Sequence, residues 1–218
     1  MTEFTLWDIV RNLLLAARWT VLLSLAAFVG GGALGLLVMF ARLSRRSWLR
    51  GISWAFIEVL QGTPLLMQLF LAFFGLSLAG LETSPLVAAS IALTLWAAAF
   101  LAEIWRGCVE SIPRGQWDAS SSLALSYAQQ MRHVILPQAL RIAVPPTVGF
   151  SVQIVKGTAL TSIIGFVELS RAGTMIANAS FQPFTVYGIA ALVYFLLCWP
   201  LSKASRSLEK RLDVAHRP

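Results

Sequence analysis

The sequence predicts an all-α membrane protein with about five transmembrane helices. Among its 218 residues, 57% are hydrophobic and only 12% are charged. Soluble domains average about 45–50% apolar and about 25% charged residues. A single soluble core of this length could not bury so much apolar surface, and several long stretches carry no charge. An ordinary cytosolic enzyme, a disordered chain and a collagen-like fibre are therefore excluded.

The first predicted span is Trp19–Ala41, which is 23 residues long and contains no charge. A spanning helix needs about 20 mainly apolar residues, because the hydrocarbon core is about 30 Å thick. Three consecutive glycines, residues 30–32, lie in its middle and would let another helix approach closely. Glu3 and Asp8 precede the run, so we expect a retained span rather than a cleavable signal peptide.

Four further spans are shorter or less regular. They are predicted at Phe56–Leu78, interrupted by Gly62-Thr63-Pro64; at Leu86–Trp105; at Ala139–Ile164, which prolines and glycines make irregular; and at Val186–Ser202. Five spans place the two termini on opposite sides of the membrane.

Most of the 17 Lys and Arg residues lie on one side of this topology. They are Arg42, Arg45, Arg46, Arg50, Arg106, Arg114, Arg132, Arg141, Lys203, Arg206, Lys210, Arg211 and Arg217. By the positive-inside rule this side is cytoplasmic, so residues 1–18 form an extracytoplasmic segment and residues 208–218 a cytoplasmic tail. The net charge of +7 thus reports topology and anionic headgroups, and it needs no nucleic-acid partner.

The stretch of about residues 107–138, between the third and fourth spans, is too polar to cross the membrane. Pro113 and Gly115 interrupt the chain after the third span. Gln116–Leu125 is then predicted as a short helix, with Asp118 in its first turn, where a carboxylate is stabilised by the positive end of the helix dipole.

A second short helix is predicted at Tyr127–Val134, with Ser126 as its N-cap and Pro137 at its end. Such a helical hairpin can expose small side chains as a knob for a cytoplasmic partner, or it can lie on the lipid headgroups. Spacing alone leaves both interpretations open. The small residues concerned are Ala119, Ser120 and Ala124.

The register of this loop resembles a known pattern. Asp118-Ala119-Ser120 is followed after three residues by Ala124, and after nine more by Val134-Ile135-Leu136-Pro137. The loop is similar to that of permease subunits of bacterial ATP-driven (ABC) importers of the polar amino-acid branch, where the pattern is Glu-Ala-Ala, three residues, Gly, nine residues, Ile-x-Leu-Pro. Ala at the Gly position predicts a turn that does not need a positive φ.

Four other segments resemble this branch in the same order along residues 18–207. They are residues 56–66, with Gln61 where the branch has Arg; residues 102–107; residues 112–116; and residues 153–169, with Gly157-Thr158-Ala159 where Asp-Thr-Ser is usual. One such motif is weak evidence, whereas five in order are strong.

The resemblance implies that residues 19–207 form a type I ABC importer transmembrane domain in a bacterial inner membrane. It implies a cytoplasmic ATPase dimer that carries the ATP and Mg²⁺, a second permease subunit that is identical or homologous, and an extracytoplasmic solute-binding protein. This chain itself is expected to hold no cofactor or metal. The residues implied in ATPase coupling are Gly115, Asp118, Ala119, Ser120, Ala124, Leu136 and Pro137; the alternative for Asp118 is a simple helix-terminal charge.

Charges within the spans are functional candidates, because a charge at mid-bilayer costs a few kcal/mol. Glu103 and Arg106 are three residues apart on one helix and are expected to pair as a structural element. Glu58 lies three residues before Gln61, where the family has Arg. We expect it to be neutral, hydrated or paired elsewhere, and the sequence does not decide among these.

Lys156, Thr158 and Glu168 flank the irregular end of the fourth span. Irregular backbone at membrane depth is tolerated only within protein or beside a watery cavity. The three side chains have the chemistry to bind a zwitterionic amino acid. The alternative is that Lys156 and Glu168 neutralise each other or neighbouring spans.

No catalytic constellation is visible, and the chain is not expected to be an enzyme. His133 and His216 stand alone as expected solvated loop residues, and Cys108 and Cys198 lack disulfide or zinc spacing. The sequence has no G-x-x-x-x-G-K-[ST] phosphate loop. The rival functions are a self-sufficient secondary transporter, which would require inverted repeats, and a structural scaffold, which would not require the hairpin register.

Overall fold

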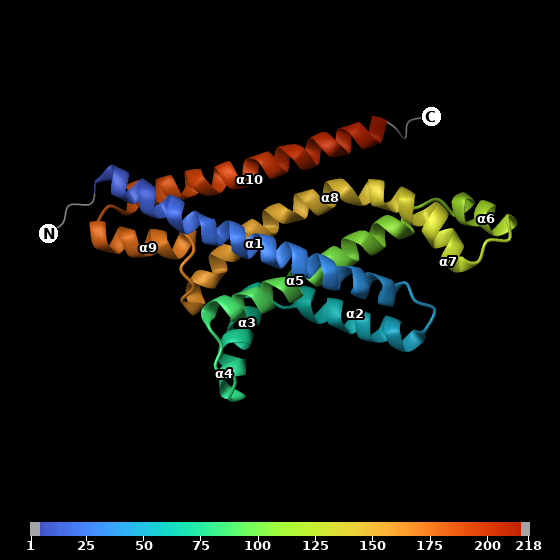
Figure 1. The fold of residues 1–218 in the computed structure, drawn as a ribbon, viewed down its shortest axis with the longest axis horizontal. Coiled ribbons are helices and arrows are strands. Elements are labelled where there is room, and N and C mark those ends of the chain that lie inside the picture. Colours follow the sequence, from blue (N-terminus) through green and yellow to red (C-terminus); the bar gives the residue numbers. More distant parts are fainter. Residues whose placement is uncertain (1–4, 215–218) are drawn as a thin grey trace.

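The computed structural model describes residues 5–214, and these residues form helices and turns without a strand (Figure 1). The helices are α1 (Leu6–Arg42), α2 (Ser47–Gly62), α3 (Leu65–Phe70), the π-helical η1 (Leu71–Gly75), α4 (Leu76–Leu78), α5 (Pro85–Glu110), α6 (Arg114–Ser122), α7 (Tyr127–Gln130), the π-helical η2 (Met131–Ile135), α8 (Leu136–Gly157), the 3₁₀-helical η3 (Thr158–Ile164), α9 (Leu169–Ser180) and α10 (Pro183–Val214).

Four helical runs are long and apolar enough to cross a membrane, and a bent helix pair supplies a fifth crossing if its two parts count as one. The long helices run along the longest axis of the molecule, as Figure 1 shows, with α6, α7 and the α1–α2 turn at one end and α9 at the other. α1 begins near the α9 end and α10 finishes toward the α6–α7 end. The prediction of an all-α membrane fold with about five spans is confirmed.

α1 begins well before the predicted start of the first span. Thr5 and Asp8 form a capping box, in which the Asp8 backbone N–H donates to Thr5 Oγ1 at 3.2 Å and Thr5 N–H donates to Asp8 Oδ2 at 3.2 Å. This box satisfies donors that would otherwise lack partners at the helix start. The helix therefore starts 13 residues before the span predicted at Trp19–Ala41.

The glycines of α1 let it pack closely on α5. A Cβ placed on Gly31 would lie 2.6 Å from Ala97 Cβ, and one on Gly35 would lie 3.0 Å from the Ala98 carbonyl oxygen. Only the absence of a side chain permits this approach, as the sequence predicted. The contact lies beside the larger core cluster, which includes Leu93 and Leu101.

The second span is not one helix. α2 starts at Ser47, and the chain bends by 105° between α2 and the α3–α4 segment. Gln68 holds the bend, because its Nε2 donates to the carbonyl oxygens of Leu60 at 2.8 Å and Thr63 at 3.1 Å. Pro64 caps α3 in an extended conformation. The interruption predicted at Gly62-Thr63-Pro64 is thus confirmed, and it divides the second span into a broken pair of helices.

The helix after the hairpin continues further than predicted. Residues from Tyr127 to Ile164 form one helical run, so Pro137 does not end a helix; it lies in the first turn of α8, directly after the wider π-helical turn of η2. The run ends at Gly165, whose φ of 88° is in the left-handed region that favours glycine. The irregularity predicted near residue 164 is confirmed as η3 and this turn.

α9 was not predicted from the sequence, although its apolar positions follow a helical spacing. The buried residues of this helix are Leu169, Ala172, Gly173, Ile176 and Ala177. Glu168 caps it by accepting a hydrogen bond from the Arg171 backbone N–H at 2.9 Å. α10 then extends beyond the predicted Val186–Ser202 at both ends and continues through Pro200.

Candidate functional site

The helical hairpin forms one tip of the molecule (Figure 1). α6 begins at Arg114 after the N-cap Pro113, with the exposed Gly115 as its second residue. The predicted start at Gln116 is two residues late, so Asp118 is the fifth residue of the helix and does not lie in its first turn. Its side chain is exposed, and the expected interaction with the helix dipole is therefore not its role.

Only some of the small hairpin residues face outward. Ala119 and Ala124 are exposed, whereas Ser120 is 2% exposed and its Oγ donates to the Trp117 carbonyl oxygen at 2.8 Å. The expectation that Ser120 is on the surface is wrong, because the helix turns this position toward the rest of the hairpin.

Ala124 ends α6 in a Schellman arrangement. The Leu125 N–H donates to the Ser120 carbonyl oxygen at 3.3 Å, and the Ala124 N–H donates to that of Ser121 at 2.9 Å. Ala124 has a φ of 56°. The prediction that this turn would not need a positive φ is wrong, since alanine holds a left-handed conformation here.

The second half of the hairpin begins as predicted at Ser126. Its backbone N–H and Oγ donate to Gln129 Oε1 at 2.8 and 2.9 Å. At the junction with α8, Leu136 is half-buried and Pro137 is exposed. The hairpin is therefore rigidly capped on both sides of its turn, with a continuous helix leading from it into the membrane.

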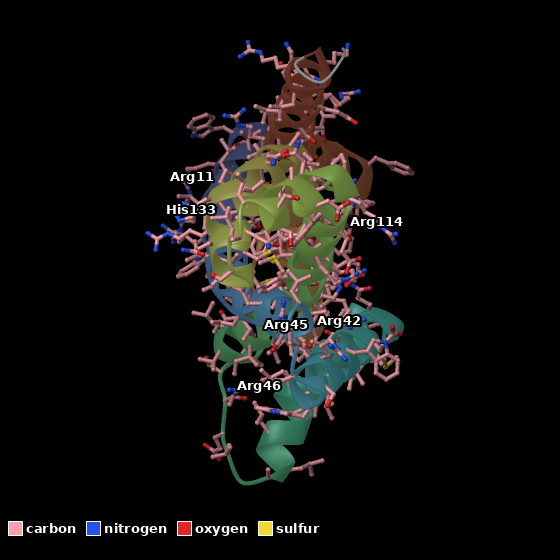
Figure 2. All side chains as sticks on the ribbon, turned by 90° about the vertical axis from the view of Figure 1, so that its right-hand side faces the viewer. Arg11, Arg42, Arg45, Arg46, Arg114 and His133 are labelled. Carbon is pink, nitrogen blue, oxygen red and sulfur yellow. The ribbon has the colours of Figure 1, made fainter. Side chains whose placement is uncertain are left out.

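Basic side chains surround this end of the molecule (Figure 2). Those labelled there at this end are Arg42, Arg45, Arg46, Arg114 and His133. His133 is exposed, as expected, but it lies in the π-helical η2 rather than in a loop. His216 lies outside the described residues.

Glu103 and Arg106 form the predicted ion pair near the end of α5, and Arg106 also pairs with Glu110. The Arg106 Nε donates to Glu103 Oε2 at 2.9 Å. Arg106 thus bridges two carboxylates on one helix face, which is a structural role.

Glu168 is fully buried, and its partners are hydroxyl and backbone groups rather than a lysine. Its Oε2 accepts from the Tyr194 hydroxyl at 2.7 Å and from Thr20 Oγ1 at 3.3 Å. The predicted alternative of mutual neutralisation with Lys156 is wrong within residues 5–214, where the ion pairs involve neither residue.

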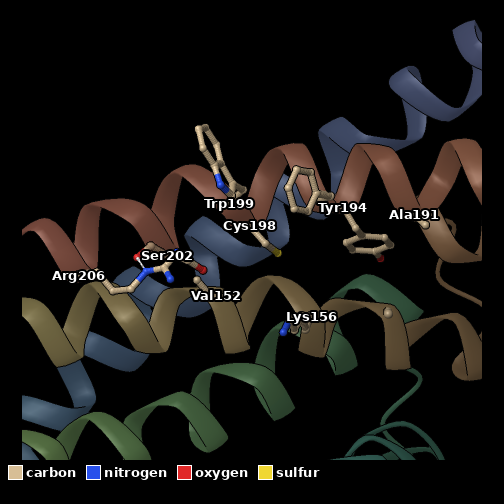
Figure 3. Close-up of a pocket in the computed structure, with 10 residues that line it drawn as sticks. Val152, Lys156, Ala191, Tyr194, Cys198, Trp199, Ser202 and Arg206 are labelled. Carbon is tan, nitrogen blue, oxygen red and sulfur yellow. Dashed lines mark hydrogen bonds between the residues drawn. The ribbon is translucent and has the colours of Figure 1, made fainter.

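Lys156 instead faces a groove of about 580 Å³ between α8 and α10. Figure 3 shows it opposite Cys198 on the neighbouring helix, with Arg206 further along the groove beside Ser202. Its side chain is exposed and makes no ion pair with any described residue.

Thr158 is turned away from this groove, because it is fully buried and its Oγ1 donates to the Val155 carbonyl oxygen at 2.8 Å. The structure therefore does not bring Lys156, Thr158 and Glu168 together around one cavity. Tyr194 is not among the predicted site residues, and it reaches Glu168 from α10.

Glu58 and Gln61 lie on α2, away from the groove. Gln61 Nε2 donates to the Ala99 carbonyl oxygen at 3.3 Å. Glu58 is exposed and unpaired among the described residues. No group of three metal-binding side chains occurs within the described part of the chain, and Cys108 and Cys198 are both free thiols there.

A bundle of long apolar helices, with a capped helical hairpin at one tip and a broken helix pair at membrane depth, defines a membrane-embedded transport subunit. The chain belongs to the family of binding-protein-dependent transport system inner membrane components, which it matches over residues 31–214. It is accordingly a permease subunit of an ABC importer, and its fold is that of a type I importer transmembrane domain.

Relatives match it over nearly their whole length. The probable amino-acid ABC transporter permease protein YckA of Bacillus subtilis (strain 168) is 35% identical over 94% of this chain and 95% of its own. The glutamine transport system permease protein GlnP of Escherichia coli (strain K12) is 34% identical over 96% of each chain.

Solved structures show the same fold. A crystal structure of an amino acid ABC transporter with histidines superposes with a TM-score of 0.89 and 30% identity over 96% of this chain and 100% of the other. A chain of the MetNI methionine ABC transporter in an inward-facing conformation superposes with a TM-score of 0.78 and 20% identity. The match covers 92% of this chain and 96% of the other. The second likeness concerns the fold alone.

Proposed function

We propose that this subunit forms one half of an import pathway for a polar amino acid or a close analogue. The observation that carries the proposal is the match, over more than nine-tenths of the chain, to permeases named for amino-acid and glutamine transport. The second half would be an identical or homologous permease. An extracytoplasmic binding protein would deliver the solute, and two cytoplasmic ATPase subunits would supply the ATP and Mg²⁺.

The α6–α7 hairpin would dock on the ATPase. The exposed residues along it that would make the contact are Gly115, Asp118, Ala119 and Ala124. The small side chains among them would let the ATPase surface approach the helix backbone closely. Ser120 would support the docking helix from inside. Leu136 and Pro137 would carry its displacement into α8, because the helix is continuous from the hairpin to the membrane.

The basic residues at the hairpin end support a cytoplasmic location for this tip. The N-terminal end of α1 would then be extracytoplasmic and the end of α10 cytoplasmic. ATP binding would draw the two ATPase subunits together, move the paired hairpins and open the pathway outward; hydrolysis would reset it.

Lys156 is the strongest pathway candidate, because its ammonium is unpaired among the described residues and faces a groove. It would attract the solute carboxylate. Glu58 and Gln61 on α2 would meet the solute only where the second permease closes over them. Thr158 and Glu168 are buried and would shape the pathway without touching the solute.

The decisive experiment is reconstitution of the complete complex in proteoliposomes with its binding protein. Uptake should require internal ATP and the ATPase subunits. Ala119→Arg should abolish uptake and ATPase co-purification while leaving membrane insertion intact, whereas the size-matched Ala119→Ser should retain both. Full-rate uptake driven by an ion gradient without the ATPase would instead identify a self-sufficient secondary transporter.

A further inference from the structure

Tyr127, the first residue of α7, contacts segments that are remote from it in the sequence. Its ring stacks on Trp117 of α6, with 6.2 Å between ring centroids and 20° between planes. The Arg45 guanidinium carbon lies 5.0 Å from the Tyr127 ring centroid. The Tyr127 hydroxyl donates to the Leu43 carbonyl oxygen at 3.4 Å. One side chain thus joins the hairpin to the end of α1.

The Leu43 end of this connection is firmly attached to α1. Leu43 is the C-cap of that helix, and its own N–H donates to the Met39 carbonyl oxygen at 2.9 Å. Met39 is buried in a core cluster with Ile135 and Met131, against which Leu43 and Tyr127 also pack. A displacement of Tyr127 would therefore displace the last turn of α1.

The chain itself links the hairpin only to α5 and α8, because α6 follows α5 and α7 leads into α8. α1 adjoins neither helix of the hairpin in the sequence. Yet α1 spans the whole bundle, packs along α5 through Gly31, and reaches Glu168 through Thr20. A mechanism that moves α1 together with the hairpin needs a non-covalent link.

We infer that Tyr127 is the positioning residue that passes movement of the docking helix α6 to the end of α1, through its ring contact with Trp117 and its contacts with Arg45 and Leu43. This inference rests on the proposed coupling to an ATPase. Each contact is individually weak, as exposed cation–π contacts and single aromatic pairs are. Contacts of this strength can transmit a movement and reform in each cycle.

The test compares variants of the complete complex in proteoliposomes, with the number of solute molecules imported per ATP hydrolysed as the readout. Tyr127→Leu removes the ring and the hydroxyl, Tyr127→Phe removes only the hydroxyl, and Arg45→Gln removes only the cation. We expect Tyr127→Leu and Arg45→Gln to lower this ratio by about twofold or more, as for other residues on a coupling path. Tyr127→Phe should have a smaller effect.

Two matched controls are available. Tyr187→Phe removes a hydroxyl that donates to Thr174 Oγ1, also at 3.4 Å, but in α10 and remote from the hairpin. Arg46→Gln removes an exposed cation beside Arg45 whose guanidinium makes no hydrogen bond, ion pair or ring contact with the described residues. Both should keep the wild-type ratio, basal ATPase rate and ATPase co-purification.

The double variant Arg45→Gln/Tyr127→Leu should be no worse than Tyr127→Leu, because the two groups act on one path. The inference is overturned if all variants keep the wild-type ratio, or if the ratio falls only together with thermal stability or ATPase retention. A wild-type complex that transports without its ATPase would overturn the proposed function instead. A coupled wild-type complex with unaffected variants would overturn this inference alone.

Discussion

The Tyr194 hydroxyl on α10 donates to Glu168 Oε2 at 2.7 Å, at the N-terminus of α9. Thr20 Oγ1 of α1 donates to the same oxygen at 3.3 Å. The same Thr20 hydroxyl accepts a hydrogen bond from the Leu169 backbone N–H at 3.2 Å. A buried carboxylate is tolerated only where donors replace its hydration. Here those donors come from three helices, so the carboxylate fastens α1, α9 and α10 together.

Glu168→Ala should therefore destabilise the protein, because it removes the α9 cap and the acceptor of the Thr20 hydroxyl, and leaves Tyr194 only Ser170 Oγ at 2.9 Å as a partner. The expected cost is about 1–3 kcal/mol for the unsatisfied groups. Thermal unfolding of the detergent-solubilised protein measures it. Tyr194→Phe should cost less, and the double variant should fall short of the sum of the two.

The control for that series is Glu82→Ala, which removes an exposed carboxylate from the turn before α5. It should leave the unfolding temperature unchanged. Equal effects of the Glu82 and Glu168 variants, or strict additivity of Glu168→Ala and Tyr194→Phe, would contradict the assigned network.

Ala124→Gly should stabilise the hairpin, because alanine at a φ of 56° is strained by about 1–2 kcal/mol relative to glycine. The matched control is Ala128→Gly in α7, where a helical glycine should cost about 0.5–1 kcal/mol. Hydrogen exchange of the hairpin amides, measured by mass spectrometry, should slow in the first variant and quicken in the second. Destabilisation by both would show that Ala124 is not held in the left-handed region.

The spans and the hairpin could be predicted from the sequence because both depend on local composition. A run without charge predicts a membrane helix wherever it packs, and Ser126 caps a helix through Gln129, three residues away. The family register likewise placed Asp118 and Ala124 in the hairpin. The predicted place of Asp118 in the first turn is wrong because α6 starts two residues earlier, and the predicted φ of Ala124 is wrong because α6 ends in a Schellman arrangement.

Features that depend on distant residues could not be predicted. The side-chain partners of Glu168 lie on α1 and α10, far away in the chain. Sequence proximity therefore suggests Lys156 as its partner instead. The break at Gly62-Thr63-Pro64 was visible, but the 105° angle is set partly by Gln68 folding back on it. The helix α9 is not predicted because it is only 12 residues long and follows an irregular turn.

Lys156→Met should reduce uptake by about tenfold or more if its ammonium attracts the solute carboxylate, since a lost charged hydrogen bond costs about 1.5–3 kcal/mol. Lys156→Arg should retain part of the activity. Stimulation of ATP hydrolysis by the loaded binding protein should persist in both, because α6 is untouched. The control is Lys203→Met, whose ammonium lies 5.0 Å from the Trp199 ring. Equal uptake by the two methionine variants would contradict a pathway role for Lys156.

Gly31 and Gly32 are adjacent on α1 but should respond oppositely to alanine. A Cβ on Gly31 would lie 2.6 Å from Ala97 Cβ and 3.2 Å from the Ala98 backbone nitrogen, whereas the nearest atom to one on Gly32 is Trp105 Cη2 at 3.8 Å. Backbone cannot yield as a side chain can, so Gly31→Ala must separate α1 from α5, at about 1–3 kcal/mol.

Gly32→Ala meets no such obstacle and should stabilise α1 by up to about 1 kcal/mol through its higher helix propensity. Unfolding temperatures of the two variants should therefore fall on opposite sides of the wild type. The Gly31 variant should also import less solute per ATP, because α1 would no longer follow α5. If Gly31→Ala is tolerated as well as Gly32→Ala, the close α1–α5 contact is not what holds these helices together.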